Sequence, residues 1–100
     1  MLTSKQRAKL RKLAHDIETL IQIGKGGVTP GVVEQVRETL NNKELVKGKV
    51  LENSLLDAKE AAFELADKIN CDVVFTIGSK FVLFKVSDDK DKRKIFLDRL

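Results

Sequence analysis

Three glycines lie within four residues, Gly24-Lys25-Gly26-Gly27, between a strand-like apolar run and the start of a helix. The run covers residues 19–23, and the helix is indicated by Thr29 as N-cap followed by Pro30, whose missing N–H costs nothing at the first helical position. Glycine lets the backbone turn sharply and adopt positive φ between the two. The chain must therefore run from a strand through a tight turn into a helix, as at the start of a strand–helix–strand crossover.

Capping residues and apolar spacing predict the remaining elements. Thr3 and Gln6 form a capping box before a helix over residues 4–16, and Asp57 and Glu60 form another at the start of a later helix. The buried stripe predicted for that helix is Leu10, Leu13, Ala14 and Ile17. After the strand at 19–23, the predicted elements are a helix over 30–42 that ends in a left-handed conformation at Asn41-Asn42, a strand over 45–51, a helix over 57–70, and a hairpin of strands 73–77 and 80–85 joined by Gly78-Ser79.

The order α-β-α-β-α-β-β predicts an α/β (α+β) two-layer sandwich with a four-stranded mixed sheet. The second and third helices are expected on one face of the sheet. We expect one domain over residues 1–86 and a tail over 87–100 that is a short helix or mobile. Gly48 interrupts a predicted strand, as a bulge or a point of close approach. Phe63 falls off the apolar stripe of its helix, and covering the core edge is favoured over a protein contact.

Charge is unevenly distributed along this chain of 100 residues, whose formal net charge is +4. Residues 1–18 hold five basic and two acidic groups, residues 28–72 six basic and nine acidic, and residues 80–100 seven basic and four acidic. A basic excess at the two ends and at the glycine loop is typical of a surface for RNA or DNA. No apolar run could span a bilayer, and the start resembles no signal peptide. With a single cysteine, Cys71, the chain is expected in the cytoplasm.

The glycine loop admits three interpretations. It is a plain strand-to-helix turn, an anion site in which backbone amides and Lys25 hold phosphate, or a nucleotide-binding loop. The spacing of the glycines matches neither G-x-G-x-x-G nor a P-loop, which argues against nucleotide binding. It does match G-x-x-G, the form of loop with which KH domains clamp the backbone of single-stranded RNA. Together with the basic residues around it, this match favours a nucleic-acid phosphate.

Few residues could support catalysis. His15 is the only histidine, and neither it nor Cys71 has a second metal-ligating neighbour in the sequence. The carboxylates lie mainly on helix faces opposite the apolar stripes, where they are solvated. We therefore expect no catalytic residue, no metal and no cofactor, and the chain is not expected to be an enzyme.

Several motifs, in a shared order, resemble the CRM domain (chloroplast RNA splicing and ribosome maturation) in its stand-alone bacterial form, the YhbY-like proteins. They are Leu2-Thr3-x-Lys5-Gln6-Arg7 with Leu10-Arg11, Ile23-Gly24-Lys25-Gly26-Gly27-Val28-Thr29, Glu44-Leu45-Val46-Lys47, and the Ile77-Gly78 hairpin ending at Phe84-Lys85. Two positions depart from the pattern, since Lys85 stands where arginine is expected and Gly48 where an apolar residue is expected. The resemblance implies a fold similar to the C-terminal domain of translation initiation factor 3. It also implies RNA binding through the glycine loop and association with precursors of the large ribosomal subunit.

We therefore expect a monomeric, non-catalytic protein that contacts rRNA during assembly of the large ribosomal subunit, with no membrane or small-molecule partner. A protein-interaction module that reaches the same pathway through Phe63 or an exposed strand edge remains an alternative. The candidate RNA-binding residues are Gly24, Lys25, Gly26 and Gly27 in the loop, Lys5, Arg7, Lys9, Arg11 and Lys12 in the first helix, and Lys47, Lys49, Lys80 and Lys85 in the strands. Because phenylalanine is the only large aromatic residue, binding should be strongly salt-dependent with modest sequence preference.

Overall fold

The order of helices and strands agrees with the prediction from the sequence, and a short 3-10 helix follows the last strand. The computed structural model describes residues 2–93 and 95. Its elements are α1 (Ser4–Ala14), β1 (Thr19–Ile23), α2 (Pro30–Lys43), β2 (Leu45–Val50), α3 (Ala58–Ile69), β3 (Asp72–Ile77), β4 (Lys80–Phe84) and the 3-10 helix η1 (Lys90–Lys92). Both predicted capping boxes are formed, by Thr3 with Gln6 in α1 and by Asp57 with Glu60 in α3.

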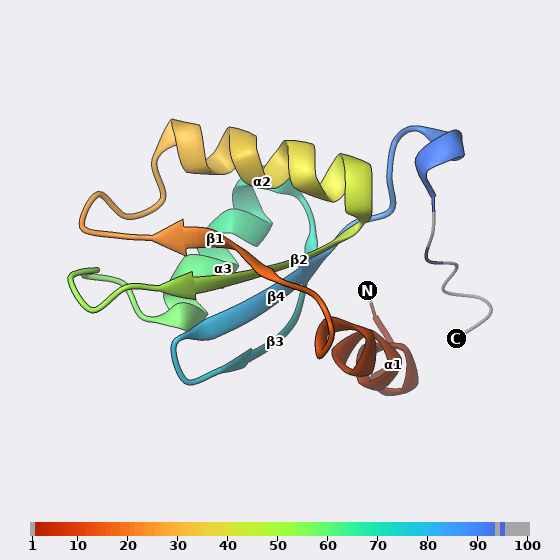
Figure 1. Ribbon diagram of the computed structural model, residues 1–100, viewed down its shortest axis with the longest axis horizontal. Coiled ribbons are helices and arrows are strands. Elements are labelled where there is room, and N and C mark those ends of the chain that lie inside the picture. Colours follow the sequence, from red (N-terminus) through yellow and green to blue (C-terminus); the bar gives the residue numbers. More distant parts are fainter. Residues whose placement is uncertain (1, 94, 96–100) are drawn as a thin grey trace.

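The four strands form one mixed sheet in the order β1-β2-β4-β3 (Figure 1). β1 and β2 are parallel and are connected by α2, whereas β4 pairs antiparallel with both β2 and β3. The predicted two-residue turn Gly78-Ser79 joins β3 to β4, with Gly78 at φ 57°. The α/β class and the four-stranded mixed sheet are thus confirmed, and β1 and β3 are the edge strands.

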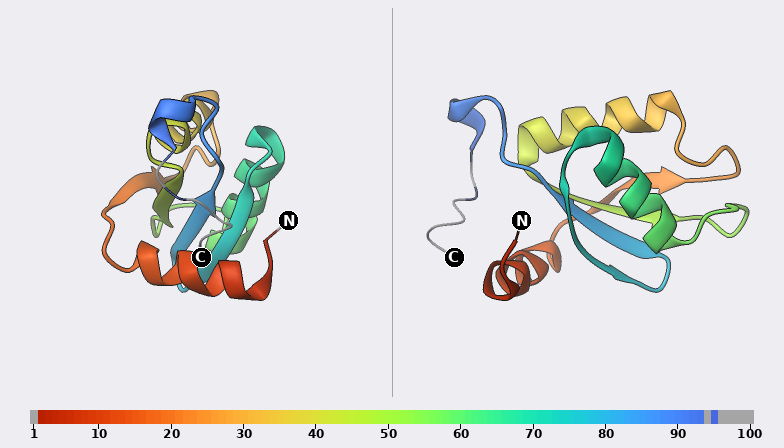
Figure 2. Two further views of the ribbon diagram at one scale, coloured as in Figure 1. Left: turned by 90° about the vertical axis from the view of Figure 1, so that its right-hand side faces the viewer. Right: turned by 180° about the vertical axis from the view of Figure 1, so that it is seen from behind.

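The two faces of the sheet are covered unequally (Figures 1 and 2). α2 and α3 lie on one face, as predicted, and enclose the larger buried cluster, which includes Ile21, Ile23, Val36, Leu40, Val46, Leu65, Phe81 and Leu83. α1 lies on the opposite face and packs Leu10 and Ala14 against β3 and β4 side chains such as Val74, Val82 and Phe84. Figure 1 shows α1 near the end of the sheet where β1 begins, so the part of this face near the glycine loop carries no helix.

α1 is shorter than predicted and buries fewer side chains. It ends at Ala14 rather than Asp16, and Leu13, which we expected in the core, is 44% exposed. Leu10 and Ala14 are fully buried, and Ile17 packs against their cluster from the connection to β1. The error at Leu13 arises because the apolar stripe predicted from spacing is wider than the strip of α1 that contacts the sheet.

The end of α2 also differs from the prediction. Asn41 and Asn42 are helical, and the left-handed residue is Glu44, with φ 66°. Its amide closes the helix by donating to the Leu40 carbonyl at 2.7 Å. The side chain of Asn41 is used elsewhere, since its Oδ1 accepts a hydrogen bond from the amide of Asp88 at 3.0 Å. A contact with a segment 47 residues away therefore determines the role of Asn41, and local sequence does not show it.

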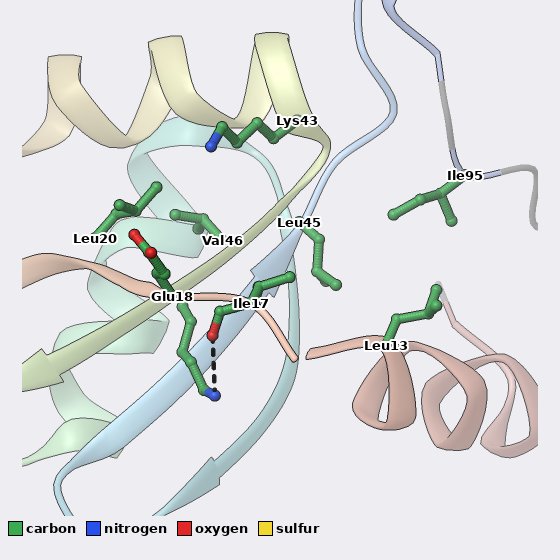
Figure 3. A pocket seen from close by; sticks show the side chains of 9 residues that line it. Leu13, Ile17, Glu18, Leu20, Lys43, Leu45, Val46 and Ile95 are labelled. Atoms are coloured by element: carbon green, nitrogen blue, oxygen red, sulfur yellow. Dashed lines mark hydrogen bonds between the residues drawn. The ribbon is translucent and has the colours of Figure 1, made fainter. Parts of the chain in front are cut away.

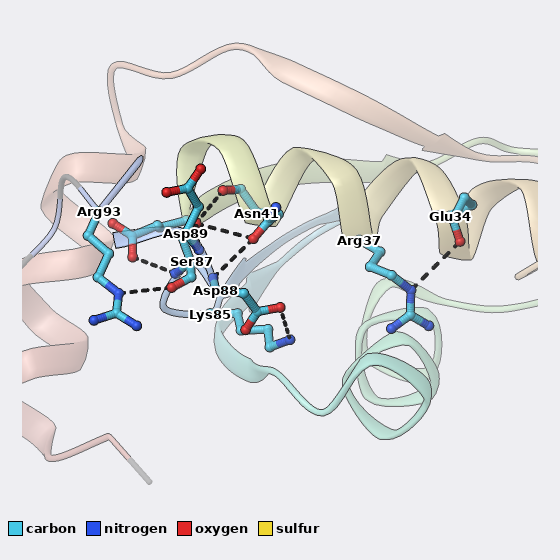
Figure 4. Close-up of polar contacts among 9 residues, drawn as sticks. Glu34, Arg37, Asn41, Lys85, Ser87, Asp88, Asp89 and Arg93 are labelled. Atoms are coloured by element: carbon cyan, nitrogen blue, oxygen red, sulfur yellow. Dashed lines mark hydrogen bonds and ion pairs between the residues drawn. The ribbon is translucent and has the colours of Figure 1, made fainter. Parts of the chain in front are cut away.

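Part of the predicted tail is fastened to this end of α2 (Figure 4). Ser87 is buried, and its hydroxyl donates to the Asn41 carbonyl at 2.6 Å. The 3-10 helix η1 follows, and Lys92 Nζ donates to Asn42 Oδ1 at 2.8 Å. Residues 94 and 96–100 of the predicted tail lie outside the described residues.

Two interpretations were open for Gly48 and two for Phe63, and the structure distinguishes between them. A Cβ added to Gly48 would lie 2.4 Å from the Phe81 ring, so Gly48 marks a close approach rather than a bulge, and the register shifts fall in β1 and β3 instead. Phe63, which we expected to cover the edge of the core, is 55% exposed and belongs to neither buried cluster.

Candidate nucleic-acid interface

The glycine loop is a tight turn with a charged tip. The amide of Gly27 donates to the carbonyl of Gly24 at 3.1 Å, which places Lys25 and Gly26 at the tip. Gly27 has φ 69°, a conformation in which any other residue would be strained. Lys25 is exposed, and among residues 2–93 and 95 the amides of Lys25 and Gly26 have no hydrogen-bond partner. The tip can therefore offer an anion one ammonium group and two amide donors.

The start of α2 offers an anion less than the sequence suggests. The hydroxyl of Thr29 accepts from the amide of Val32 at 3.2 Å, and the amide of Thr29 donates to the Gly27 carbonyl at 3.1 Å. Pro30 has no amide hydrogen to give. Part of the donor capacity of this helix end is therefore used within the fold, because Thr29 caps the helix. Any anion contact in this region depends mainly on the loop tip.

Next to the loop, the uncovered part of the sheet presents polar and basic side chains. We call this surface the open sheet face and define it as Gln22, Lys47, Lys49, Ile77 and Lys80. Side chains alternate between the two faces of a sheet, and these five share the face on which α1 packs. Gln22 pairs with Lys49, and Lys49 pairs with Lys80 on the neighbouring strand. The open sheet face therefore extends across all four strands from the edge that precedes the glycine loop.

Lys49 and Lys80 form a like-charge pair on neighbouring strands of this face, which is electrostatically unfavourable. Like charges directly opposite one another on neighbouring strands destabilise a sheet by a fraction of ~1 kcal/mol. Neither lysine forms a salt bridge with any other residue that the structure describes. Folding alone gives no reason for this arrangement, whereas an anion bound between the two ammonium groups would relieve their repulsion.

A groove of about 210 Å³ continues the open sheet face toward α1, and it is lined by Arg11, Ala14, His15, Lys47, Phe75, Ile77, Lys80 and Val82. The guanidinium carbon of Arg11 lies 4.7 Å from the centre of the Phe75 ring, within the range of a cation–π contact. Lys47 is partly fixed, because its Nζ donates to the Ile17 carbonyl at 3.4 Å. Arg11 and Lys47 are thus held in place by the fold while remaining at the surface.

The other basic residues of α1 are not brought to the glycine loop. Figure 1 shows α1 and the loop toward opposite ends of the sheet. Arg7 donates to the Val73 carbonyl of the edge strand β3 at 3.4 Å. Lys5, Lys9 and Lys12 are exposed and lie roughly opposite the buried Leu10 and Ala14 around the helix. A ligand must therefore cross the open sheet face to reach both the loop and α1.

Lys85 stands apart from the other candidates. It follows β4, and its Nζ lies 3.9 Å from a carboxylate oxygen of Asp88. Together with Glu34, Arg37 and Glu38 it lines a separate hollow beside α2, shown in part in Figure 4. The structure therefore does not group Lys85 with the loop and the open sheet face.

Two residues of this region were not among the predicted candidates. His15 lines the groove beside Arg11 and Lys47, and Gln22 is exposed between Lys49 and the loop. The signal for Gln22 was available, since it lies between the buried Ile21 and Ile23 in a strand with two-residue periodicity. No local signal placed His15, because its position depends on how α1 crosses the sheet.

Among the described residues, little supports metal binding, a reactive thiol or a membrane-spanning helix. Residues 2–93 and 95 hold no group of three or more His, Cys, Asp or Glu side chains suited to a metal ion. Burial, together with the nearby charge of Asp72, raises the pKa of the Cys71 thiol to about 11, so the thiol is not activated. Within the same part of the chain, no helix has the length and apolar character needed to cross a bilayer.

Comparison with known proteins gives one consistent result. Residues 2–85 match the family described as the CRS1 / YhbY (CRM) domain. A Bacillus subtilis protein named "Probable RNA-binding protein YqeI" is 39% identical over 97% of this chain and 99% of its own length. A Haemophilus influenzae protein named "RNA-binding protein" is 30% identical over 88% of this chain and 89% of its own length.

A solved structure agrees with the fold. The solution structure of the hypothetical protein SAV1595 from Staphylococcus aureus matches with a TM-score of 0.76 and 40% identity, over 95% of this chain and 99% of that one. The names of the relatives describe RNA binding and not catalysis, in agreement with the prediction that the chain is not an enzyme.

Proposed function

The chain belongs to the CRS1/YhbY (CRM) domain family, and from this we propose that it is a non-catalytic RNA-binding protein. The proposed binding surface is the open sheet face together with the tip of the glycine loop, Lys25 and Gly26. Arg11 and His15 extend it toward α1. The relatives named for RNA binding support the class of ligand, and the geometry supports the choice of surface.

The observation that carries this proposal is the cross-strand pair of Lys49 and Lys80. These lysines have no described carboxylate partner, and they lie on the part of the α1 face that no helix covers. Gln22 connects them to the strand that enters the loop. A polyanion that runs from the loop toward α1 would meet Lys25, Lys49, Lys80 and Arg11 in turn. Phosphate contacts of this kind give affinity and register, and they do not read sequence.

The proposed contacts predict how binding responds to salt. Four neutralised phosphates give a slope of log affinity against log salt of roughly −3 for single strands and closer to −4 for duplex-like geometry. Raising salt from 50 to 200 mM should then weaken binding by roughly two orders of magnitude. Base stacking adds little, because Arg11 already lies over the Phe75 ring.

We further propose that the RNA is rRNA in precursors of the large ribosomal subunit. This step rests on the family resemblance and not on the geometry of the surface. Co-sedimentation of the chain with such precursors, and its absence from mature subunits, would support it. Recovery only through a protein partner that survives ribonuclease treatment would instead favour the alternative of a protein-interaction module.

Lys49→Glu is the sharpest test of the surface, because it moves stability and binding in opposite directions. The change replaces a like-charge pair with an opposite-charge pair, so the free energy of unfolding should rise by a few tenths of ~1 kcal/mol. The same change should weaken binding of an rRNA fragment roughly tenfold at low salt. The measurements are denaturant unfolding and fluorescence anisotropy.

Lys59→Glu is the matched control, since Lys59 is exposed on α3 and the change in net charge is the same. It should leave the affinity within about twofold of the wild type if binding depends on the open sheet face. Equal weakening by both variants would mean that only net charge matters, and the proposed surface would be wrong.

A further inference from the structure

A hollow of about 510 Å³ lies between the end of α3, the start of β3 and the start of α1. Phe63 and Asp67 both line it, and they share a face of α3 because they are one helical turn apart, at i and i+4. Phe63 is 55% exposed and belongs to neither buried cluster. The folded chain therefore leaves a large aromatic side chain at this hollow, next to a carboxylate.

The charge of this hollow is mainly negative. Asp72 also lines it, and neither Asp67 nor Asp72 forms an ion pair with any other residue in the part of the chain that the structure describes. The C-terminus of α3 ends here as well, at its cap Asn70, and the negative end of a helix dipole attracts cations. Lys68 offsets little of this charge, since its Nζ lies 3.1 Å from a carboxylate oxygen of Glu64.

Arg7 brings a positive charge to the same lining, but the backbone uses its guanidinium. Its Nη2 donates to the carbonyl of Val73, in the edge strand β3, at 3.4 Å. This bond occupies a carbonyl that an added strand would need for pairing. A partner therefore has to dock here through a side chain rather than by extending the sheet.

The mainly apolar groove where α1, the start of β1 and the start of β2 meet has no such bias of charge (Figure 3). Its volume is about 370 Å³, and its lining carries both signs of charge, with Glu18 against Lys43 and Lys47. Charge therefore selects no partner for that groove, whereas it selects a cation for the hollow beside α3.

We propose that the hollow beside α3 binds an arginine side chain presented by a protein partner. A guanidinium can lie over the face of the Phe63 ring while it donates to the carboxylate of Asp67 or Asp72. The fold already contains one guanidinium–ring contact of this kind, that of Arg11 with Phe75, at 4.7 Å.

The size of the hollow favours a peptide segment over free arginine. It exceeds the volume of one side chain, so residues that flank the arginine would also contact it, at the apolar Leu2 and Val73. None of its lining residues belongs to the open sheet face, so this partner and the proposed RNA would not compete for the same side chains.

The test is a titration of the isotope-labelled full chain with a blocked pentapeptide that has one central arginine flanked by alanine and leucine. We expect saturable shifts of the Phe63 ring resonances and of the amides of Asp67 and Asp72, with a dissociation constant in the millimolar range. The same peptide with lysine in place of arginine should bind roughly threefold more weakly, because an ammonium group lacks the planar surface that stacks on a ring. Citrulline, which is uncharged, should weaken binding by roughly tenfold.

Two variants of the chain test the named side chains. Phe63→Ala and Asp67→Asn should each weaken binding of the arginine peptide roughly threefold, and both positions are exposed, so the fold should persist. Leu55→Ala and Asp91→Asn are the matched controls, since they remove an exposed apolar side chain and an exposed carboxylate that do not line the hollow. Both controls should leave the affinity unchanged.

The proposal is overturned if the arginine peptide gives no saturable shift at Phe63, Asp67 or Asp72. It is also overturned if the lysine peptide binds equally well and Phe63→Ala weakens neither peptide, because the attraction would then be one of charge alone. Shifts of the Phe63 resonances with protein concentration alone would overturn it too, since a second copy would then occupy the hollow. No RNA is present in these measurements, so their outcome is separate from that of the proposed function.

Discussion

The ring of Phe81 lies so close to Gly48 that it limits which residue β2 can carry at this position. A Cβ at this position would lie within 3 Å of three atoms of the Phe81 ring, which is itself fully buried. The ring cannot move far, because protein interiors are packed to crystal-like density. The Phe81 ring therefore fills the space that the apolar side chain expected here from the family pattern would need.

Gly48→Ala should destabilise the fold by about 1–3 kcal/mol, as overpacking of a core does. Gly31→Ala is the control, because Gly31 is exposed in the first turn of α2 and its nearest neighbour atom is 3.9 Å from an added Cβ. That control should be neutral or stabilising by a few tenths of ~1 kcal/mol. Equal unfolding free energies for the two variants, measured in urea, would show that the ring moves aside.

The Cys71 thiol should react slowly. Burial and the neighbouring Asp72 raise its pKa from 9.0 to about 11, so the thiolate fraction near pH 8 falls roughly a hundredfold below that of a free cysteine. The rate of alkylation of the folded chain by iodoacetamide should still be rising at pH 10. The rate for the urea-unfolded chain should level off about two pH units below the plateau of the folded chain. Rates that level off together would contradict the burial of this thiol.

At the scale of elements, local signals were sufficient wherever the contacts that form an element are local. The capping boxes of α1 and α3, Pro30 at the start of α2 and the two-residue Gly78-Ser79 turn all appear as predicted. Errors fall where distant segments meet. Leu13 is exposed because α1 contacts the sheet along a narrow strip. α2 continues past Asn41 and Asn42 to its cap at Glu44, whose carboxylate accepts from the amides of Ser87 and Ile95.

The candidate site shows the same division. The glycine loop and the lysines of β2 could be found from spacing, since turns and two-residue periodicity are local. That Lys49 faces Lys80 and that Arg11 lies over Phe75 depends on strand register and on the path of α1, which the sequence does not display. The position of His15 could not be predicted because it depends on the path of α1 across the sheet. The exposure of Gln22, in contrast, follows from the two-residue alternation of β1.

Glu44→Gln tests whether this buried carboxylate fastens the segment that follows β4. The amide can accept only through its oxygen, so one of the bonds to Ser87 and Ile95 is lost, at a cost of about 1–3 kcal/mol in unfolding free energy. Hydrogen exchange at those two backbone amides should accelerate more than at β-sheet amides. Glu38→Gln, an exposed change on the same helix, should alter neither.

If the amides of Ser87 and Ile95 keep their protection in Glu44→Gln, the carboxylate is not what holds the segment. A uniform loss of protection throughout the sheet would mean that the change lowers the stability of the whole domain rather than the attachment of this segment.

At the scale of the whole molecule, the fold separates its charges onto different faces. The open sheet face carries lysines without described carboxylate partners, whereas the outer side of α3 carries acidic residues including Glu60, Glu64 and Asp67. A polyanion should therefore approach from one direction only. The monomeric state stays a prediction, which sedimentation velocity would check.

RNA binding on the open sheet face can be tested by mapping the amide chemical shifts of the chain during titration with an rRNA fragment at low salt. If RNA binds there, the largest changes fall on Lys25, Gly26, Gln22, Lys49 and Lys80, with smaller changes at Arg11 and His15, and they diminish together as salt is raised. Changes centred on the outer side of α3, or on Phe63 and the β3 edge, would contradict the claim that RNA binds the open sheet face.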